Sequence, residues 1–161
     1  MIGAAAFNHP IDFDCASVTD MTDMLRETSL FDQPLPFDTS RVTSLSGTFA
    51  AANAFNRPLA WDVSRVATMH GMFDGGKTGI TFDQSLPFDT SSVTSMKQMF
   101  YAHYTCRPWH CDFAFNYPLA FDTGSVRTMD SMFDNAAAFN QPLPFDVGSV
   151  TNMYSMFASQ D

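Results

Sequence analysis

The chain has few basic residues: 8 Lys and Arg stand against 17 Asp and Glu, which gives a formal net charge of −9 over 161 residues. Because phosphate backbones are bound by clusters of positive charge, this balance argues against a nucleic-acid partner. The sequence also lacks any apolar run of the roughly 18 residues that a transmembrane helix requires. Its first residues have neither the basic start nor the apolar stretch of a secretory signal peptide.

Glutamate is nearly absent, since every acidic residue except Glu27 is Asp. In contrast, Phe occurs 17 times and Met 11 times. A hydrophobic content of 45% is sufficient for a buried core and differs from that of a disordered acidic segment. So uneven a composition indicates that one short pattern is written several times.

The repeated pattern reads F-[ND]-x-P-L-x-[FW]-D-x-x-x-V-x-x-M-x-x-M-F. Its units begin at Phe7, Phe31, Phe55, Phe82, Phe115 and Phe139. Every Phe except Phe113 and every Met except Met1 occupies a pattern position. Two insertions, residues 74–81 and 101–114, interrupt the spacing, and insertions of this kind map to loops on one face of a repeat array. Residues 1–161 therefore form a single repeat domain.

Each unit contains two hydrophobic periodicities. Leu35 and Phe37 lie two residues apart, which predicts a short strand with one buried face. A second apolar stripe falls on Val150, Met153, Met156 and Phe157. Its spacing predicts a helix of about two turns. Between the two segments, residues that cap helices bracket the expected helix starts at Thr39 or Ser40 and at Val63 or Ser64.

Neither element is stable alone, because a two-turn helix and a four-residue strand both need partners. We therefore expect an α/β repeat solenoid of the leucine-rich-repeat type, in which about six repeats stack their strands into a parallel sheet. The Met stripe is interpreted as core packing and not as a copper site or a peptide groove. Neither end of the chain supplies a capping layer, so we expect part of a longer array, or ends covered by partners.

The string FNQPLPFDVGSVTNMYSMF, residues 139–157, resembles the bacterial surface-protein repeat of BspA-like lipoproteins, which also occurs in algae and protists. The match extends from Phe7 to Phe157. The resemblance implies a leucine-rich-repeat-like solenoid at the cell surface or outside the cell, with a role in adhesion or protein binding. It implies no catalytic residues and no cofactor.

The second insertion concentrates aromatic and polar residues. Its candidate partner contacts are Tyr101, Tyr104, Trp109 and His110. Three states remain open for Cys106 and Cys111: a disulfide that closes the loop, two free thiols, or a metal site that also uses His103 and His110. The disulfide is the preferred alternative, and the metal site is disfavoured because this cysteine and histidine spacing is not typical of zinc. Cys15 is interpreted as a small buried residue.

Two polar rows follow from the repeat. The Asp row consists of Asp14, Asp38, Asp62, Asp89, Asp122 and Asp146. The Asn/Asp row consists of Asn8, Asp32, Asn56, Asp83, Asn116 and Asn140. The Asp row could bind calcium, but capping of a helix or turn is the preferred interpretation. The Asn/Asp row is expected to bond turn backbone.

No nucleophile, base and orienting group recur together, and the glycines before Lys77 lack the spacing of a phosphate-binding loop. We therefore expect a protein that is not an enzyme and uses no metal or other cofactor. The first hypothesis is a scaffold that binds a protein or glycan through its sheet face or through the 101–114 loop. The alternative is a structural accessory subunit embedded in a larger multiprotein assembly.

Overall fold

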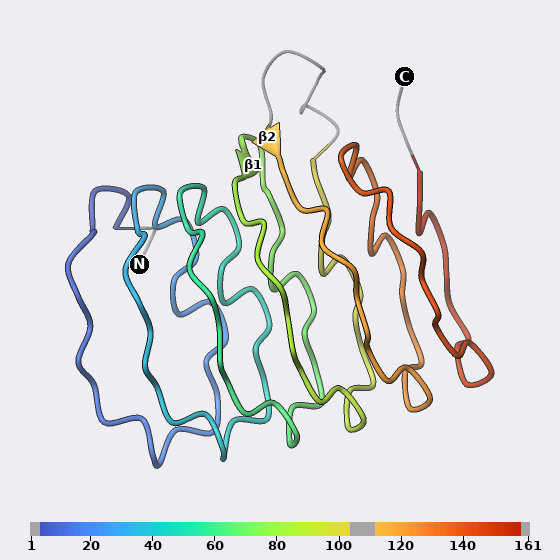
Figure 1. The fold of residues 1–161 in the computed structure, drawn as a ribbon, viewed down its shortest axis with the longest axis horizontal. Coiled ribbons are helices and arrows are strands. Elements are labelled where there is room, and N and C mark those ends of the chain that lie inside the picture. The colour runs from blue at the N-terminus through green and yellow to red at the C-terminus, as the bar shows by residue number, and fades with distance from the viewer. Residues whose placement is uncertain (1–3, 104–111, 159–161) are drawn as a thin grey trace.

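The computed structural model describes residues 4–103 and 112–158. The backbone forms a stack of layers, one for each repeat unit, with the first and last layers at opposite ends of the long axis (Figure 1). We number the layers 1 to 6 in chain order, starting at Phe7, Phe31, Phe55, Phe82, Phe115 and Phe139.

The predicted α/β architecture is wrong, because the described residues contain no helix and almost no strand. The strands are β1 (Gly79–Ile80) and β2 (Asp112–Phe113), which pair in parallel with Gly79 opposite Asp112 and Ile80 opposite Phe113. Elsewhere isolated parallel bridges join neighbouring layers at one pattern position. The bridged residues are Asp20, Ser44, Thr68, Ser95, Thr128 and Asn152. The sheet of one strand per repeat, and with it the expected sheet face, is therefore absent from the described residues.

The segment expected to be a helix is a run of tight turns. In layer 1, the N–H of Met24 donates to the carbonyl oxygen of Met21, three residues back, at 3.2 Å. An α-helix would instead bond residues four apart. The N–H of Asp23 donates to the carbonyl oxygen of Ser46 in layer 2, at 2.9 Å. Successive N–H groups thus alternate between bonds within the layer and bonds to the next layer, and no helical ladder forms.

These turns require a left-handed backbone at one fixed position, where φ lies between 51° and 62° in all six layers. The residues there are Asp23, Gly47, Gly71, Gln98, Ser131 and Ser155. A positive φ at the third residue is the requirement of a type II turn and is costly inside a helix. Apolar spacing of three residues fits either structure, which is why it misleads. The signal for turns is the glycine that layers 2 and 3 place at this position.

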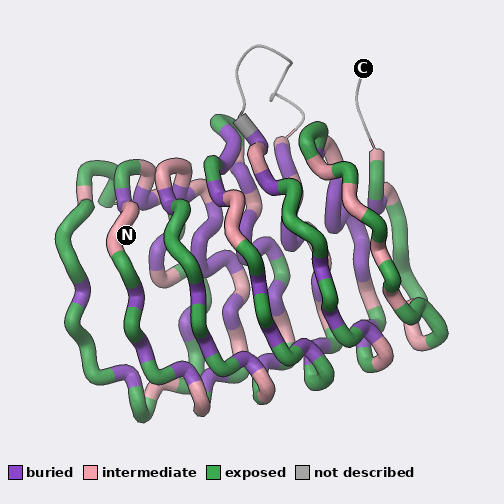
Figure 2. The backbone as a smooth tube through the Cα atoms, in the orientation of Figure 1, coloured by how far each residue is buried: buried purple, intermediate pink, exposed green. Residues whose placement is uncertain are grey.

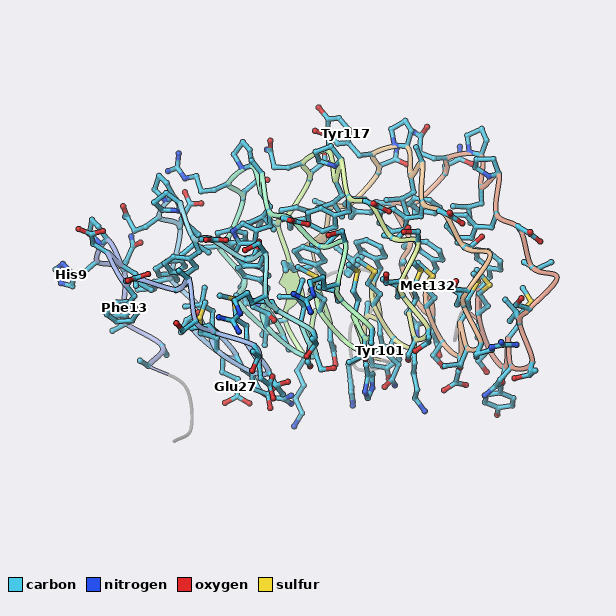
Figure 3. The ribbon with its side chains drawn as sticks, turned by 90° about the horizontal axis from the view of Figure 1, so that it is seen from below. His9, Phe13, Glu27, Tyr101, Tyr117 and Met132 are labelled. Atoms are coloured by element: carbon cyan, nitrogen blue, oxygen red, sulfur yellow. The ribbon has the colours of Figure 1, made fainter. Side chains whose placement is uncertain are left out.

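Buried positions recur in every inner layer (Figure 2), and the core is filled by aromatic columns that run along the stack (Figure 3). Phe73 is fully buried between Phe49 and Phe100, with ring centroids 5.4 and 5.7 Å away, and packs on Phe82 at 4.3 Å. Each buried side chain of this size contributes about 1.5–3 kcal/mol. The interpretation of the Met stripe as core is confirmed in the middle layers by the complete burial of Met69, Met72, Met96 and Met99.

The segment predicted as a strand is extended but unpaired. Leu35 and Phe37 are buried and Pro36 is exposed, so the alternation is present without a ladder. The Asn/Asp row supplies the connection instead. The Oδ1 of Asn8 accepts a bond from the N–H of Asp32 at 3.0 Å, and the same bond links each later pair of layers. The row bonds backbone as predicted, but the expected turn within the same layer is wrong, because the bonded N–H belongs to an extended residue of the next layer.

The Asp row forms Asx turns within each layer. The Oδ1 of Asp38 accepts a bond from the N–H of Ser40 at 3.0 Å, and the bond recurs in all six layers. Hydrogen bonding to Ser40 lowers the pKa of the exposed Asp38 carboxyl. Turn formation by the row is thus confirmed, but the predicted helix caps at Thr39 or Ser40 and at Val63 or Ser64 are wrong, since no helix follows.

Candidate binding surface

The two insertions lie side by side, although they leave different layers. Pairing of β1 with β2 joins them, and the N–H of His103 donates to the carbonyl oxygen of Gly76 at 3.2 Å. The contact is close at Gly75, where an added Cβ would lie 3.2 Å from Cδ2 of Phe113 and 3.2 Å from Cα of Gly79. Ile80 and Phe113 are buried beneath this contact. The described parts of the insertions, residues 74–81, 101–103 and 112–114, therefore lie together at one edge of the stack, near its middle (Figure 1).

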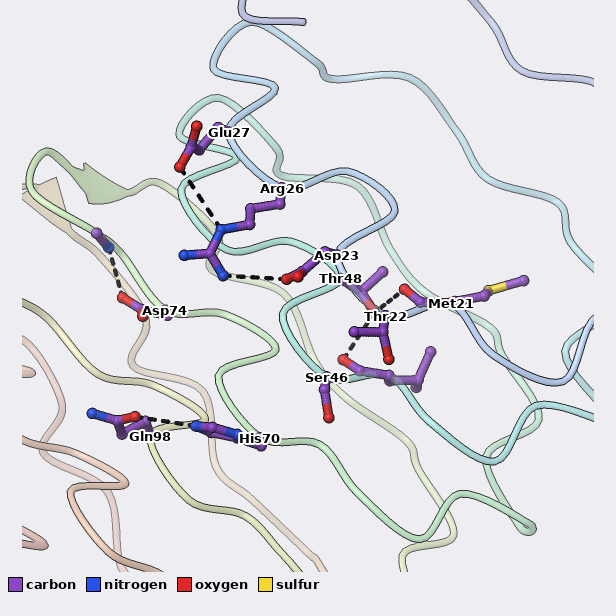
Figure 4. Close-up of polar contacts among 12 residues, drawn as sticks. Met21, Thr22, Asp23, Arg26, Glu27, Ser46, Thr48, His70, Asp74 and Gln98 are labelled. Atoms are coloured by element: carbon purple, nitrogen blue, oxygen red, sulfur yellow. Dashed lines mark hydrogen bonds and ion pairs between the residues drawn. The ribbon is translucent and has the colours of Figure 1, made fainter. Parts of the chain in front are cut away.

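Polar and aromatic side chains gather next to this edge. We call His70, Asp74, Gln98, Tyr101 and His103 the insertion surface. His70 Nε2 and Gln98 Oε1 are 3.1 Å apart, which links layers 3 and 4 (Figure 4). The rings of Tyr101 and His103 meet edge to face, with centroids 6.3 Å apart and an interplanar angle of 83°. These groups offer hydrogen-bond donors, acceptors and ring faces to a partner.

Asp74 lies at the inner side of the insertion surface. Its Oδ1 accepts a bond from the N–H of Gly76 at 2.8 Å. Burial raises the pKa of the Asp74 carboxyl, against the opposing effects of this bond and of nearby Arg26, His103 and His70. At neutral pH the surface therefore holds a carboxylate that is partly removed from water.

The raised pKa predicts the effect of an Asp74→Asn variant. The amide oxygen can still accept the Gly76 bond, and the desolvated charge is removed. We expect Tm at pH 7 to rise by about 2–4 °C, which corresponds to about 1 kcal/mol for a chain of this size. The folded state of the parent chain binds a proton at Asp74 more readily than the unfolded state does. The Tm difference between the variant and the parent chain should therefore shrink as pH falls through the raised pKa of Asp74 in the folded state. It should vanish below the ordinary value of 3.8, when both states are protonated.

Thermal unfolding of both proteins between pH 3 and pH 8 checks this expectation. Asp38→Asn is the matched control, because hydrogen bonding lowers the pKa of that carboxyl and the sign of the pH dependence is reversed. A lower Tm for Asp74→Asn at pH 7 would show that the carboxylate stabilises the fold.

Among the predicted contact residues, Tyr101 is half-buried and lies on the insertion surface. Tyr104, Cys106, Trp109, His110 and Cys111 lie outside the described residues. The disulfide, free-thiol and metal alternatives therefore remain predictions.

Three further findings concern only the described part of the chain. Cys15 is buried, as predicted, and its burial raises the pKa of the thiol. No group of three or more His, Cys, Asp or Glu side chains within residues 4–103 and 112–158 is placed to hold a metal ion. Over the same residues, no helix has the length and apolar character needed to cross a membrane.

Two groups of ion pairs were not anticipated from the sequence. Lys97 Nζ lies 2.7 Å from Oδ2 of the largely buried Asp130. Arg26 contacts Asp23 at 3.2 Å and Glu27 at 3.7 Å (Figure 4). The first pair was detectable, because Lys97 and Asp130 occupy the same pattern position in layers 4 and 5, and equal positions stack. The contact of Arg26 with Asp23 was detectable too, because residues three apart also meet on the surface of a helix.

Stacked layers with a shared hydrogen-bond pattern, interrupted by one pair of insertions, define a repeat protein. The chain belongs to the family described as Mycoplasma protein of unknown function, DUF285, whose pattern matches residues 1–108 and 80–161. No curated protein and no solved structure matches the chain significantly.

Proposed function

We propose that the chain is a non-enzymatic scaffold that binds a protein partner through the insertion surface. The observation that carries the proposal is the pairing of β1 with β2, which brings the two interruptions of the repeat to one place. Regular layers need no such edge for their own stability, since they bond directly to each other. Irregular segments on a rigid scaffold are the usual position of binding residues.

The chemistry of the surface favours a polar or basic protein segment. Tyr101 and His103 provide rings, and His70 and Gln98 provide hydrogen-bonding groups. Asp74 and the net charge of −9 would attract positive charge. The resemblance to BspA-like surface repeats supports a protein or glycan ligand and a position at the cell surface.

Selection of a random peptide library on the immobilised chain tests the proposal, with a glycan array as the second probe. Selected peptides should bind a Tyr101→Ala/His103→Ala variant at least about tenfold more weakly, a loss of about 1.4 kcal/mol. The matched control is Tyr117→Ala, whose ring projects from the opposite face of the stack (Figure 3). Peptides that bind both variants as well as they bind the parent chain would contradict the proposed surface. Binding to glycans alone would replace the protein partner by a carbohydrate.

A further inference from the structure

The insertion surface continues into layer 5 through one position of the repeated pattern. The N–H of Gly75 donates to the carbonyl oxygen of Tyr101 at 2.8 Å, and the N–H of Ala102 donates to that of Asp134 at 2.9 Å. These bonds place Asp74, Tyr101 and Asp134 at the same position of layers 3, 4 and 5. Hydrogen-bonded segments lie about 4.8 Å apart, so each carboxylate lies about one such step from the ring. Two carboxylates therefore flank one aromatic ring.

Neither of these two carboxylates forms an ion pair within residues 4–103 and 112–158. Two basic side chains of the turn segments are held by other acids. Arg26 contacts Asp23 at 3.2 Å and Glu27 at 3.7 Å. Lys97 Nζ lies 2.7 Å from Oδ2 of Asp130. The negative charge beside the ring is therefore available to a positive group of a partner.

Both carboxylates are half-buried, which makes the missing cation costly. Burial raises the pKa of the Asp74 carboxyl and that of the Asp134 carboxyl, and the charge of Asp130 raises the pKa of Asp134 further. The stack itself does not require an acid at this position, since layer 2 has Ala50 there and layer 6 has Ala158. A positive charge brought by a partner would offset the desolvation of both carboxylates.

We propose that an arginine of the partner protein binds over the ring of Tyr101, between the carboxylates of Asp74 and Asp134. This inference rests on the proposed function and names the partner side chain that the insertion surface takes. A guanidinium is planar, so it can stack on the ring while its N–H groups donate to a carboxylate at either side. A lysine ammonium is a compact charge without that plane. Tyr101 lies on the face of the stack opposite Tyr117 (Figure 3).

The peptides selected on the immobilised chain provide the first test. Peptides that lose binding to the Tyr101→Ala/His103→Ala variant should be enriched in arginine. Replacement of that arginine by citrulline keeps the planar group and removes the charge, and it should weaken binding at least about tenfold. Replacement by lysine keeps the charge and should weaken binding by a smaller factor. Isothermal titration calorimetry of each peptide with the parent chain measures these changes.

A double variant of the protein provides the second test. Asp74→Asn/Asp134→Asn should bind the arginine peptides at least about tenfold more weakly than the parent chain does. Its amide oxygens can still accept the hydrogen bonds that the two carboxylates accept now. The matched control is Asp38→Asn/Asp122→Asn, which removes the same charge from the Asp row and should bind like the parent chain. Thermal unfolding verifies folding, and Asp74→Asn alone replaces the double variant if that variant unfolds.

The outcomes separate this inference from the proposed function. Peptides that need Tyr101 but contain no arginine, or that bind equally well with citrulline, overturn the inference and leave the proposed function intact. Lysine peptides that bind as tightly as arginine peptides also overturn it, because the guanidinium plane would then be unnecessary. An equal loss in the Asp38→Asn/Asp122→Asn control overturns it as well, since general attraction between charges would explain the binding. If no selected peptide needs Tyr101, the proposed function and this inference both fail.

Discussion

Replacement of Phe73 by alanine is expected to lower the free energy of unfolding by about 3–5 kcal/mol, which is the range for a fully buried phenylalanine. The ring of Phe73 is completely buried and contacts three rings in the two adjacent layers: Phe49 at 5.4 Å, Phe82 at 4.3 Å and Phe100 at 5.7 Å. An alanine would leave a cavity that these stacked rings cannot close without shifting the layers themselves. Urea denaturation followed by circular dichroism measures the loss.

Phe157→Ala is the matched control, because Phe157 occupies the same pattern position in layer 6. Its ring stacks on Phe133 alone, at 5.7 Å, and is 59% exposed. We expect a loss of less than about 1 kcal/mol. Equal losses for the two variants would contradict the description of the stack as a core with an open last layer.

Gly47→Ala is the second large effect and acts through the backbone. Gly47 has φ of +62°, and an added Cβ would lie 2.1 Å from Oδ1 of Asp23. The left-handed backbone costs about 1–2 kcal/mol for a residue with a side chain. The clash adds to this cost, because Asp23 must move and its contact with Arg26 at 3.2 Å is lost. We expect a total loss of at least about 2 kcal/mol in the same denaturation measurement.

Two comparisons separate the contributions. Gly124→Ala should leave stability unchanged or raise it by up to about 1 kcal/mol, since its Cβ would lie 3.4 Å from Asp122 Oδ1 and its φ is not positive. Adding Asp23→Ala to Gly47→Ala should recover the part of the loss that the clash causes. If the double variant recovers nothing, the backbone conformation alone sets the cost.

The sequence was sufficient for features that depend on side-chain type at a repeated position. The Asp row accepts bonds from turn backbone as predicted, because a short carboxylate beside a turn reaches the N–H two residues on. The Asn/Asp row also accepts backbone bonds, although from the next layer. Burial of Met69 and Met72 followed from their spacing. These inferences hold whichever backbone conformation carries the side chains.

The secondary structure could not be obtained from hydrophobic spacing. Residues three apart lie on one side both of a helix and of a chain of turns, so Val66, Met69 and Met72 fit either. The choice depends on where the N–H groups bond, and half of those in the turn segment bond to the next layer. The sequence of a single unit does not show that its N–H groups bond to the next layer. The available signal is a glycine such as Gly71, because its positive φ is incompatible with a helix.

The candidate site was predicted only in outline. The two insertions were recognisable as breaks in the period, and Tyr101 was named as a contact. The pairing of Gly79 with Asp112 was not predictable, because these residues belong to different layers and neither segment has the alternation typical of a strand. His70 and Gln98 were missed for a related reason, since they meet across layers through the left-handed turn at Gln98.

The interlayer bonds also determine how the chain can fold. Every bond of the Asn/Asp row closes a loop between adjacent layers, with sequence separations from 24 to 33 residues. The entropy lost on closing such a loop depends only weakly on its length. The entropic cost of forming a junction is therefore nearly the same for every pair of adjacent layers. The first junction must form without a folded neighbour, and each later layer adds to a finished surface. Folding should therefore begin slowly at one pair of layers and then proceed outwards, at a rate that a longer array would barely change.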